Sequence, residues 1–138
     1  LETSIEVCHT KDVGLALATA VESKVWGKTL HIAGGTQCRT TFKEYIDNMM
    51  NIFGLGKNFL PENAFSTEPF HCGHMTTDES QKLLCYQNHT LIDYYDEVRK
   101  RVGIRKYLFW LLRPIIKYYL LKKSKYIRIN KSLLGFFL

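Results

Sequence analysis

The uneven distribution of charge is the feature that most constrains what this chain can fold into. Residues 1–97 hold 7 Lys and Arg and all 13 Asp and Glu, a net charge of −6, whereas residues 98–138 hold 12 Lys and Arg and no acid, a net charge of +12. Such an asymmetry is typical of a folded body that carries a tail for an anionic surface. We therefore expect a body in residues 1–103 and a basic amphipathic tail in residues 104–138.

Helical patterns account for most of the body. Residues 10–23 are expected to form the first helix, because apolar residues recur at the spacing of one helix face. These residues are Val13, Ala16, Leu17, Ala20 and Val21. Asp12 suits the first turn of that helix, where the helix dipole is positive. A capping box, Thr41-x-x-Glu44, predicts a second helix that ends before Gly54.

Two more helices are expected in the second half of the body. A further capping box, Thr76-x-x-Glu79, predicts a short helix, and Thr90 predicts the cap of a longer helix that stops at Gly103. The longer helix should turn these residues inward: Leu91, Ile92, Tyr95, Val98 and Val102. Residues 55–75 show no hydrophobic period, which is typical of a functional or poorly ordered loop.

Two short segments have the pattern of strands. Residues 5–8 resemble a strand already under way, and residues 29–33 alternate, with Leu30 and Ile32 on one face. Because the sequence starts at Leu1 without Met, we expect a fragment of a longer protein. Strands without their neighbours expose edges that favour a homodimer. The expected fold class is α/β, a mostly helical fragment with a few short strands.

The tail differs from the body in composition. On a helix, one side would carry Lys106, Trp110, Arg113 and Lys117, and the other would carry Leu108, Leu111, Leu112, Ile115 and Tyr119. Pro114 disfavours helix at the preceding residue, so two helical pieces are expected. The longest uncharged stretch before the end has 6 residues, residues 107–112, and a spanning helix needs about 20. Basic and aromatic residues together indicate a helix in a membrane interface.

Cysteine and histidine placement bears on compartment and metal binding. The 4 Cys include no Cys-x-x-Cys motif, and no secretory signal is visible. A cytoplasmic location, peripheral at the inner face of a membrane, is therefore expected. The run His71-Cys72-Gly73-His74 brings three potential zinc ligands together. Adjacent ligands converge poorly on one tetrahedral ion, so we expect no metal site.

Four segments of the body resemble a known family. In chain order they are His9-x-x-Asp12-Val13, Gly27-Lys28-Thr29-Leu30-His31-Ile32-Ala33-Gly34-Gly35 with Thr41-x-x-Glu44, Asp78-Glu79-Ser80-Gln81-Lys82-Leu83-Leu84-Cys85-Tyr86, and Thr90-Leu91-Ile92-Asp93. Together they resemble the C-terminal part of the NAD-dependent epimerase/dehydratases, which are extended short-chain dehydrogenase/reductases. The resemblance covers residues 5–102. It implies the substrate-binding lobe of a Rossmann-like enzyme, where ligands bind beyond the carboxyl ends of the strands.

The resemblance also implies what this segment lacks. In the family, the dinucleotide site and the catalytic Ser/Thr and Tyr-x-x-x-Lys lie in the N-terminal part, so NAD or NADP would bind to the parent protein and none to this fragment. No Gly-x-x-Gly-x-x-Gly occurs here. Tyr118-x-x-x-Lys122 has the spacing of the catalytic pair, but it lies in the basic tail and is interpreted as chance. We expect no catalytic residue and no activity from the fragment alone.

Five residues are candidates for contact with substrate, and each has a structural alternative. They are His9, Arg39, His71, His74 and Met75. A His at the end of a buried strand is often a packed core residue, and Arg39 is equally compatible with a solvated loop. The loop that holds His71, His74 and Met75 either lines a substrate cleft or forms ordinary surface.

Two departures from the family bear on the substrate. Many of its sugar-nucleotide epimerases carry an Arg four residues before the His and another about ten residues before the Asp of the third segment. Ile5 and Glu68 stand at these positions, so the usual recognition of a UDP-sugar pyrophosphate is in doubt. The expected substrate is a sugar-like or hydrophobic small molecule. The expected reaction of the parent protein is an NAD(P)-dependent epimerisation, dehydration or dehydrogenation.

The alternative function is a binding module that acts through the tail. Its partner would be an anionic membrane surface, the missing N-terminal dinucleotide-binding part or a second subunit. Nucleic acid is electrostatically compatible. The many aliphatic residues between the cations favour lipid over nucleic acid.

Overall fold

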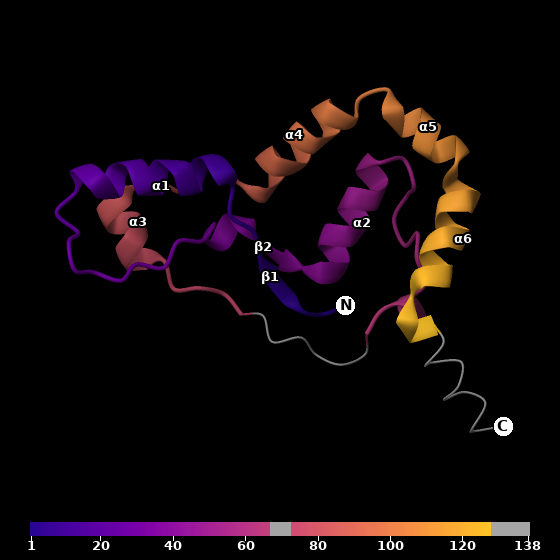
Figure 1. Cartoon of the computed structure of the whole chain (residues 1–138), viewed down its shortest axis with the longest axis horizontal. Helices are drawn as coiled ribbons and strands as arrows, with labels where there is room; N and C mark the ends of the chain where they lie inside the picture. The colour runs from indigo at the N-terminus through magenta and orange to yellow at the C-terminus, as the bar shows by residue number, and fades with distance from the viewer. Residues whose placement is uncertain (67–72, 128–138) are drawn as a thin grey trace, which may run out of the picture.

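The computed structural model describes residues 1–66 and 73–127. Within them the fold is α/β and mostly helical, with one two-stranded sheet, which confirms the expected class. The helices are α1 (Thr10–Glu22), α2 (Phe42–Ile52), α3 (Asp78–Leu84), α4 (Leu91–Val102), α5 (Arg105–Leu111) and α6 (Arg113–Lys123), with 3-10 helices η1 (Thr36–Cys38) and η2 (Glu62–Ala64). In Figure 1, α1 and α3 lie together at one end, and α4, α5 and α6 follow one another around α2.

Local capping signals set most helix ends. Thr41 caps α2 and Thr90 caps α4, and each forms a complete capping box, with Glu44 and Asp93 respectively. Both predicted helix starts are therefore confirmed. The box predicted at Thr76 and Glu79 is wrong, because α3 begins at Asp78 with Thr77 as an N-cap that makes no side-chain capping bond. The hydroxyl of Thr77 instead accepts a hydrogen bond from Gln87 Nε2 at 3.0 Å.

The sheet forms at a place that the sequence pattern did not indicate. β1 (Ser4–Glu6) pairs antiparallel with β2 (Arg39–Thr41), with Ile5 opposite Thr40. The predicted strand at residues 5–8 is thus shifted and shortened. Residues 39–41 show no alternation of apolar and polar side chains, and they become a strand because β1 supplies the hydrogen-bonding partner.

The strand predicted at residues 29–33 is wrong, because this segment is extended but has no strand beside it in the described part of the chain. Side chains bind its backbone instead. Ser80 Oγ donates to the carbonyl of His31 at 2.6 Å, and the Tyr86 hydroxyl bonds both the N–H and the C=O of Ala33, at 3.1 and 2.9 Å. Buried backbone groups need hydrogen-bond partners, and here Ser80 in α3 and Tyr86 just after α3 provide them.

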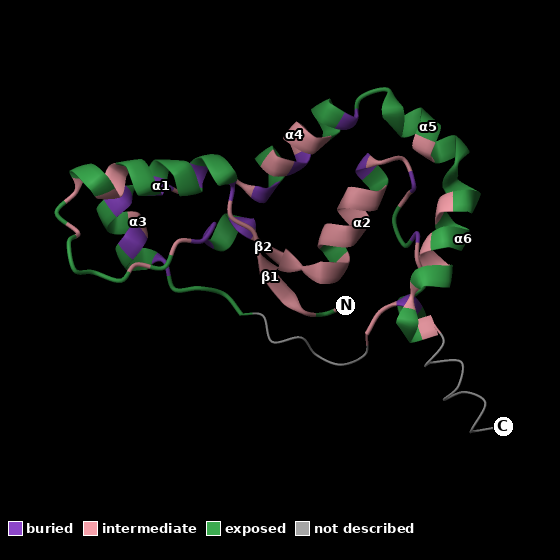
Figure 2. Ribbon diagram, viewed as in Figure 1, coloured by how far each residue is buried: buried purple, intermediate pink, exposed green. Residues whose placement is uncertain are grey.

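The hydrophobic core is divided into two small clusters. One lies between α2 and α4 and consists of Ile52, Leu91, Tyr95 and Val102; the other lies beneath α1 and consists of Ala16, Leu84 and Tyr86. Figure 2 shows these buried positions on the facing sides of the helices. The predicted inward stripe of α1 is correct for Ala16, but Leu17 and Val21 are 65% and 72% exposed. In the longer helix, α4, Ile92 is likewise 69% exposed, contrary to prediction.

The basic tail folds back along the body as two helices. Leu112 separates α5 from α6, so the break predicted next to Pro114 is confirmed. The ring of Phe109 meets Phe53 of the body edge to face at 5.5 Å, and Ser124 Oγ donates to the carbonyl of Ala64 at 2.7 Å. The division into a body and a separate tail stays a prediction.

The predicted basic side of the tail does not face outward as one stripe. Arg113 and Lys117 lie over the ring of Phe59, at 5.6 and 5.9 Å from its centroid. These two cations therefore lean on the body through cation–π contacts. The predicted apolar side, by contrast, is left largely exposed (Figure 2).

Candidate functional site

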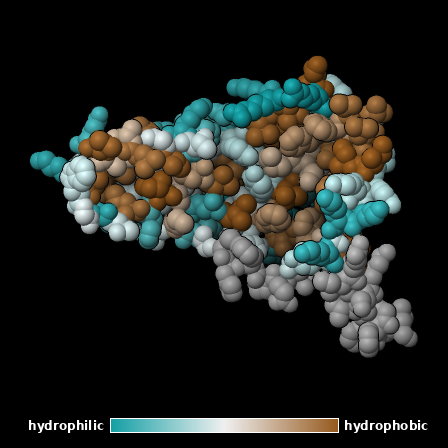
Figure 3. Space-filling model, in the orientation of Figure 1, coloured by the Kyte–Doolittle hydropathy of each residue, from teal (hydrophilic) through white to brown (hydrophobic). Residues whose placement is uncertain are grey.

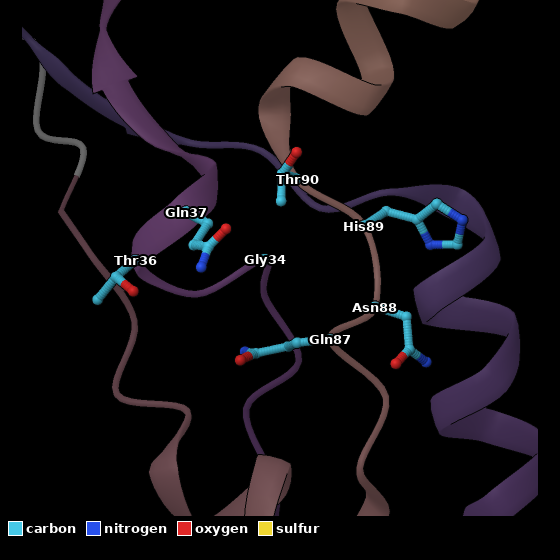
Figure 4. Close-up of a pocket in the computed structure, with 7 residues that line it drawn as sticks. All are labelled: Gly34, Thr36, Gln37, Gln87, Asn88, His89 and Thr90. Atoms are coloured by element: carbon cyan, nitrogen blue, oxygen red, sulfur yellow. The ribbon is translucent and has the colours of Figure 1, made fainter.

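An open pocket lies where the segment before η1 meets the segment before α4 (Figure 4). Its volume is about 410 Å³, which is in the range of small-molecule sites. The residues that line it are Gly34, Thr36, Gln37, Gln87, Asn88, His89 and Thr90. The lining is dominated by amides and hydroxyls and includes no Lys, Arg, Asp or Glu, which makes it suited to neutral polar groups.

Gly34 lines one wall of the pocket, and neither it nor its neighbour Gly35 has room for a side chain. A Cβ on Gly34 would lie 2.0 Å from the carbonyl oxygen of Val7 and 2.4 Å from Cβ of Cys38. Gly35 has a φ of +75°, a conformation that residues with a side chain rarely adopt. Its N–H donates to Glu6 Oε1 at 2.8 Å, so the turn is bound to β1. The close approach of Val7 and Cys38 therefore requires a glycine at position 34.

The opposite wall is held by Gln87, which follows α3. Its Nε2 donates to the carbonyl of Ala33 at 2.9 Å and to Thr77 Oγ1 at 3.0 Å. Cys85, the C-cap of α3, has a φ of +47° and turns the chain toward the pocket. Gln81 Oε1 accepts from the N–H of Gln87 at 3.0 Å. The orientation of Gln87 is therefore fixed before any ligand binds.

A buried carboxylate positions the next two residues of that wall. Asp12 in α1 is 1% exposed, and its Oδ2 accepts from the N–H groups of Asn88 and His89 at 3.2 and 3.0 Å. Its Oδ1 lies 2.5 Å from Nδ1 of His89. In Figure 4 the His89 ring points away from the pocket, toward α1. Asp12 thus anchors the pocket wall to α1 through one side chain.

A second histidine extends this cluster to α4. The ring of His9, which caps α1, stacks on His89 with centroids 4.3 Å apart, and His9 Nε2 lies 3.5 Å from Glu97 Oε2. Lys11 Nζ donates to the other oxygen of Glu97 at 2.5 Å, and this bond lowers the pKa of Glu97 below its usual value. The cluster joins α1, α4 and the pocket wall in one polar network.

A thiol behind the pocket is held in its neutral form. Cys38 is 2% exposed, and burial is the main cause that raises its pKa to about 11. Its Sγ lies 3.4 Å from the carbonyl oxygen of His89. Because the thiolate is the reactive species, Cys38 acts as a packed structural residue at neutral pH. The arrangement therefore supports binding and supplies no activated nucleophile among the pocket-lining residues.

The predicted substrate residues fall into two places, and none of the described ones lines the pocket. Arg39 Nε donates to Glu6 Oε2 at 3.2 Å, and Arg39 Nη2 donates to the carbonyl of Met75 at 3.1 Å. Met75 in turn donates its N–H to Glu6 Oε2 at 3.1 Å. His74 is exposed beside Met75, while His9 lies in the histidine cluster. His71 lies outside the described residues.

Sequence reasoning missed the partners that organise these side chains. Glu6, whose side chain is 4% exposed, neutralises Arg39, and His89 completes the cluster around Asp12. Gln37 and Gln87 were not singled out at all. The spacing His9-x-x-Asp12 was the one sequence signal for this cluster, since it places both residues at the start of one helix. Polar residues at a helix start are common, however, and they usually interact only with their own helix.

The described residues offer neither a cluster of metal ligands nor a membrane-spanning helix. In residues 1–66 and 73–127, no group of three or more His, Cys, Asp and Glu side chains is placed to hold a metal ion. Over the same ranges, every helix is too short or too polar to cross a bilayer. Cys8, Cys38 and Cys85 are free thiols.

Comparison with known proteins identifies no relative of this chain. No protein-family model matches it, and neither a curated protein nor a solved structure matches it.

Proposed function

We propose that this chain forms the substrate side of an NAD(P)-dependent epimerase, dehydratase or related dehydrogenase, and that its pocket receives a neutral, hydroxyl-rich group such as a sugar ring. The pocket lining carries this proposal, because it presents amides, hydroxyls and glycine backbone and no Lys, Arg, Asp or Glu, and the imidazole of His89 is turned away. Sugar hydroxyls both donate and accept hydrogen bonds, as amides do.

Local structure at the motif positions supports the family assignment. Cys85, in the third resembling segment, ends α3 with a left-handed φ of +47°. The next residue, Tyr86, is fully buried and binds Ala33, next to the Gly34 and Gly35 turn. Of the resembling segments, two contribute Gly34 and Thr90 to the pocket lining. Asp12 of a third binds the backbone of Asn88 and His89 in the pocket wall, as a substrate lobe would require.

The exposed face of α1 supports a larger parent protein. Val13, Leu17 and Val21 lie on it, and they are 36%, 65% and 72% exposed. A contiguous apolar helix face is typical of a helix that packs on another layer. In the proposed enzyme this layer is the dinucleotide-binding part.

The residues of this chain do not themselves fit a nicotinamide dinucleotide. The sequence has no Gly-x-x-Gly-x-x-Gly, and the pocket lacks a cation for a pyrophosphate. The proposal therefore places the cofactor, which supplies hydride transfer, and the catalytic Tyr and Lys in the rest of the enzyme. Arg39 does not fill the gap, because Glu6 already binds its guanidinium.

Titration of the isotope-labelled chain with free sugars and with UDP-sugars, followed by amide NMR, tests the pocket. We expect weak binding, in the millimolar range, because half of the site is missing. Shifts should concentrate at Gly34, Gln37 and Asn88. Gln37 lines the pocket, so Gln37→Ala should weaken binding, whereas the matched variant Asn51→Ala, at an exposed position of α2, should not.

Two results would overturn the proposal. One is an absence of shifts in the pocket with every sugar tested; the other is equal effects of Gln37→Ala and Asn51→Ala. The enzymatic part is tested separately on the whole gene product that contains this chain. Conversion of a sugar that requires NAD or NADP is expected, followed by NMR of the sugar, because an epimerase or dehydratase returns the hydride and leaves no net change in nicotinamide absorbance. A gene product that converts no sugar with either cofactor would remove the family assignment.

A further inference from the structure

The outer face of α5 and α6 is an apolar and aromatic surface with no covering layer in the described part of the chain. Leu111, Ile115 and Tyr118 are 67%, 65% and 69% exposed, and Trp110 is 62% exposed. Neither helix contains a buried residue. In Figure 3 hydrophobic side chains gather over α5 and the start of α6. A patch of this kind on one pair of helices is typical of an interaction surface.

The body fixes which side of these helices faces outward. Phe109 packs on Phe53, Arg113 lies over Phe59, and Ser124 binds the carbonyl of Ala64, so the helix side that carries these residues faces the body. On the opposite side, Leu111, Ile115, Tyr118 and Lys122 follow one another at helical spacing. The contacts with the body therefore fix the side of α5 and α6 on which the apolar stripe lies.

The charge around this face favours one kind of partner. Residues 98–138 contain no Asp or Glu, and in the described residues no Lys or Arg of α5 or α6 forms an ion pair. Arg105 and Lys106 begin the pair of helices, and Lys122 and Lys123 end it. The apolar stripe is thus bounded at both ends by positive charge without an acidic neighbour, which favours an anionic partner.

Among anionic partners, a lipid bilayer fits the stripe. Nucleic-acid phosphates would pair with the cations but would leave Leu111 and Ile115 in water. A second copy bound through the same face would bring the cations of both copies together without an acid between them. An anionic bilayer offers phosphates and carboxylates to the cations, acyl chains to the aliphatic residues, and an interface to Trp and Tyr.

We propose that the face of α5 and α6 around Leu111, Ile115 and Tyr118 docks on an anionic membrane surface and lies in its interface. This goes beyond the proposed enzymatic function and does not depend on it. The pocket lies at the start of α4, beside Thr90, whereas α5 follows the end of α4 (Figure 1), so docking through this face would leave the pocket open to solvent.

Vesicle co-sedimentation tests the proposal. The chain is mixed with vesicles of phosphatidylcholine alone and with vesicles that also contain phosphatidylserine. We expect binding to the second kind, at least tenfold weaker binding to the first, and loss of binding at high salt. Leu111→Asp and Ile115→Asp should each reduce binding at least tenfold, since they place a charge in the stripe. Val21→Asp on the exposed face of α1 is the matched control and should bind like the unaltered chain.

Far-UV circular dichroism checks that the three variants fold. Equal binding to both kinds of vesicle, or equal effects of Ile115→Asp and Val21→Asp, would overturn the proposal. Sedimentation equilibrium without lipid tests a second copy as the partner, and retention on immobilised DNA or RNA tests nucleic acid. A dimer that Ile115→Asp abolishes, together with no vesicle binding, would assign the face to a second copy, and retention on DNA or RNA but not on anionic vesicles would assign it to nucleic acid.

Discussion

The role of Asp12 gives the sharpest test of the site. If Asp12 acted merely through the dipole of α1, its removal would cost about 0.3–1 kcal/mol. The structure gives it a larger role, because its carboxylate accepts from the N–H groups of Asn88 and His89 and contacts the His89 ring while 1% exposed. Asp12→Ala leaves two partly buried amides without an acceptor, at about 1–3 kcal/mol each. Because water can reach one of them, we expect a total loss of about 2–4 kcal/mol.

Urea denaturation followed by circular dichroism measures this difference. Asp78→Ala is the matched control, since Asp78 also lies in the first turn of a helix but is exposed. It should lower the free energy of unfolding by no more than about 1 kcal/mol. Asp12→Asn keeps one acceptor oxygen and should fall between the two. If Asp12→Ala does not fold, the free energy of unfolding of Asp12→Asn is the test of the anchoring role. A decrease in that free energy no larger than the decrease for Asp78→Ala would refute the anchoring role.

Three more predictions concern cysteines. Cys85→Gly should raise the free energy of unfolding by about 1 kcal/mol, because glycine adopts the φ of +47° without the left-handed penalty; an unchanged or lower value in urea titration contradicts this. With iodoacetamide at neutral pH, mass spectrometry should show fast modification of exposed Cys85 and protection of Cys38. Because the fold raises the pKa of Cys38 from 9.0 to about 11, its contribution to stability should be complete below pH 9 and lost as pH rises through 11; stability that increases over that interval is the opposite result.

The candidate site could be anticipated only in part. The pocket lies beside segments that the sequence analysis names, since Gly34 and Thr90 line it, but the family resemblance itself stays a prediction. Residue type alone does not predict substrate contact. A charged or imidazole side chain can bind a ligand only if no neighbouring side chain already binds it, and the sequence does not show that neighbour. Arg39 is paired with Glu6, which lies 33 positions earlier in the chain.

Local interactions determined what the sequence alone could predict. The caps at Thr41 and Thr90, the stops at Gly54 and Gly103 and the break before Pro114 involve contacts within about four residues, so a short sequence window contains their whole cause. The mostly helical class follows from these signals.

Tertiary contacts decided the rest. Residues 29–33 are not a strand because Ser80 and Tyr86 bind their backbone, and the outward side of α5 and α6 is set by Phe53 and Ala64. Asp12 serves as an anchor because Asn88 and His89 lie beside it, although they are 76 and 77 positions away in the chain. A helical or alternating pattern shows that a face is apolar, but the neighbour that covers it comes from a distant segment. That neighbour is defined only when the whole chain has folded.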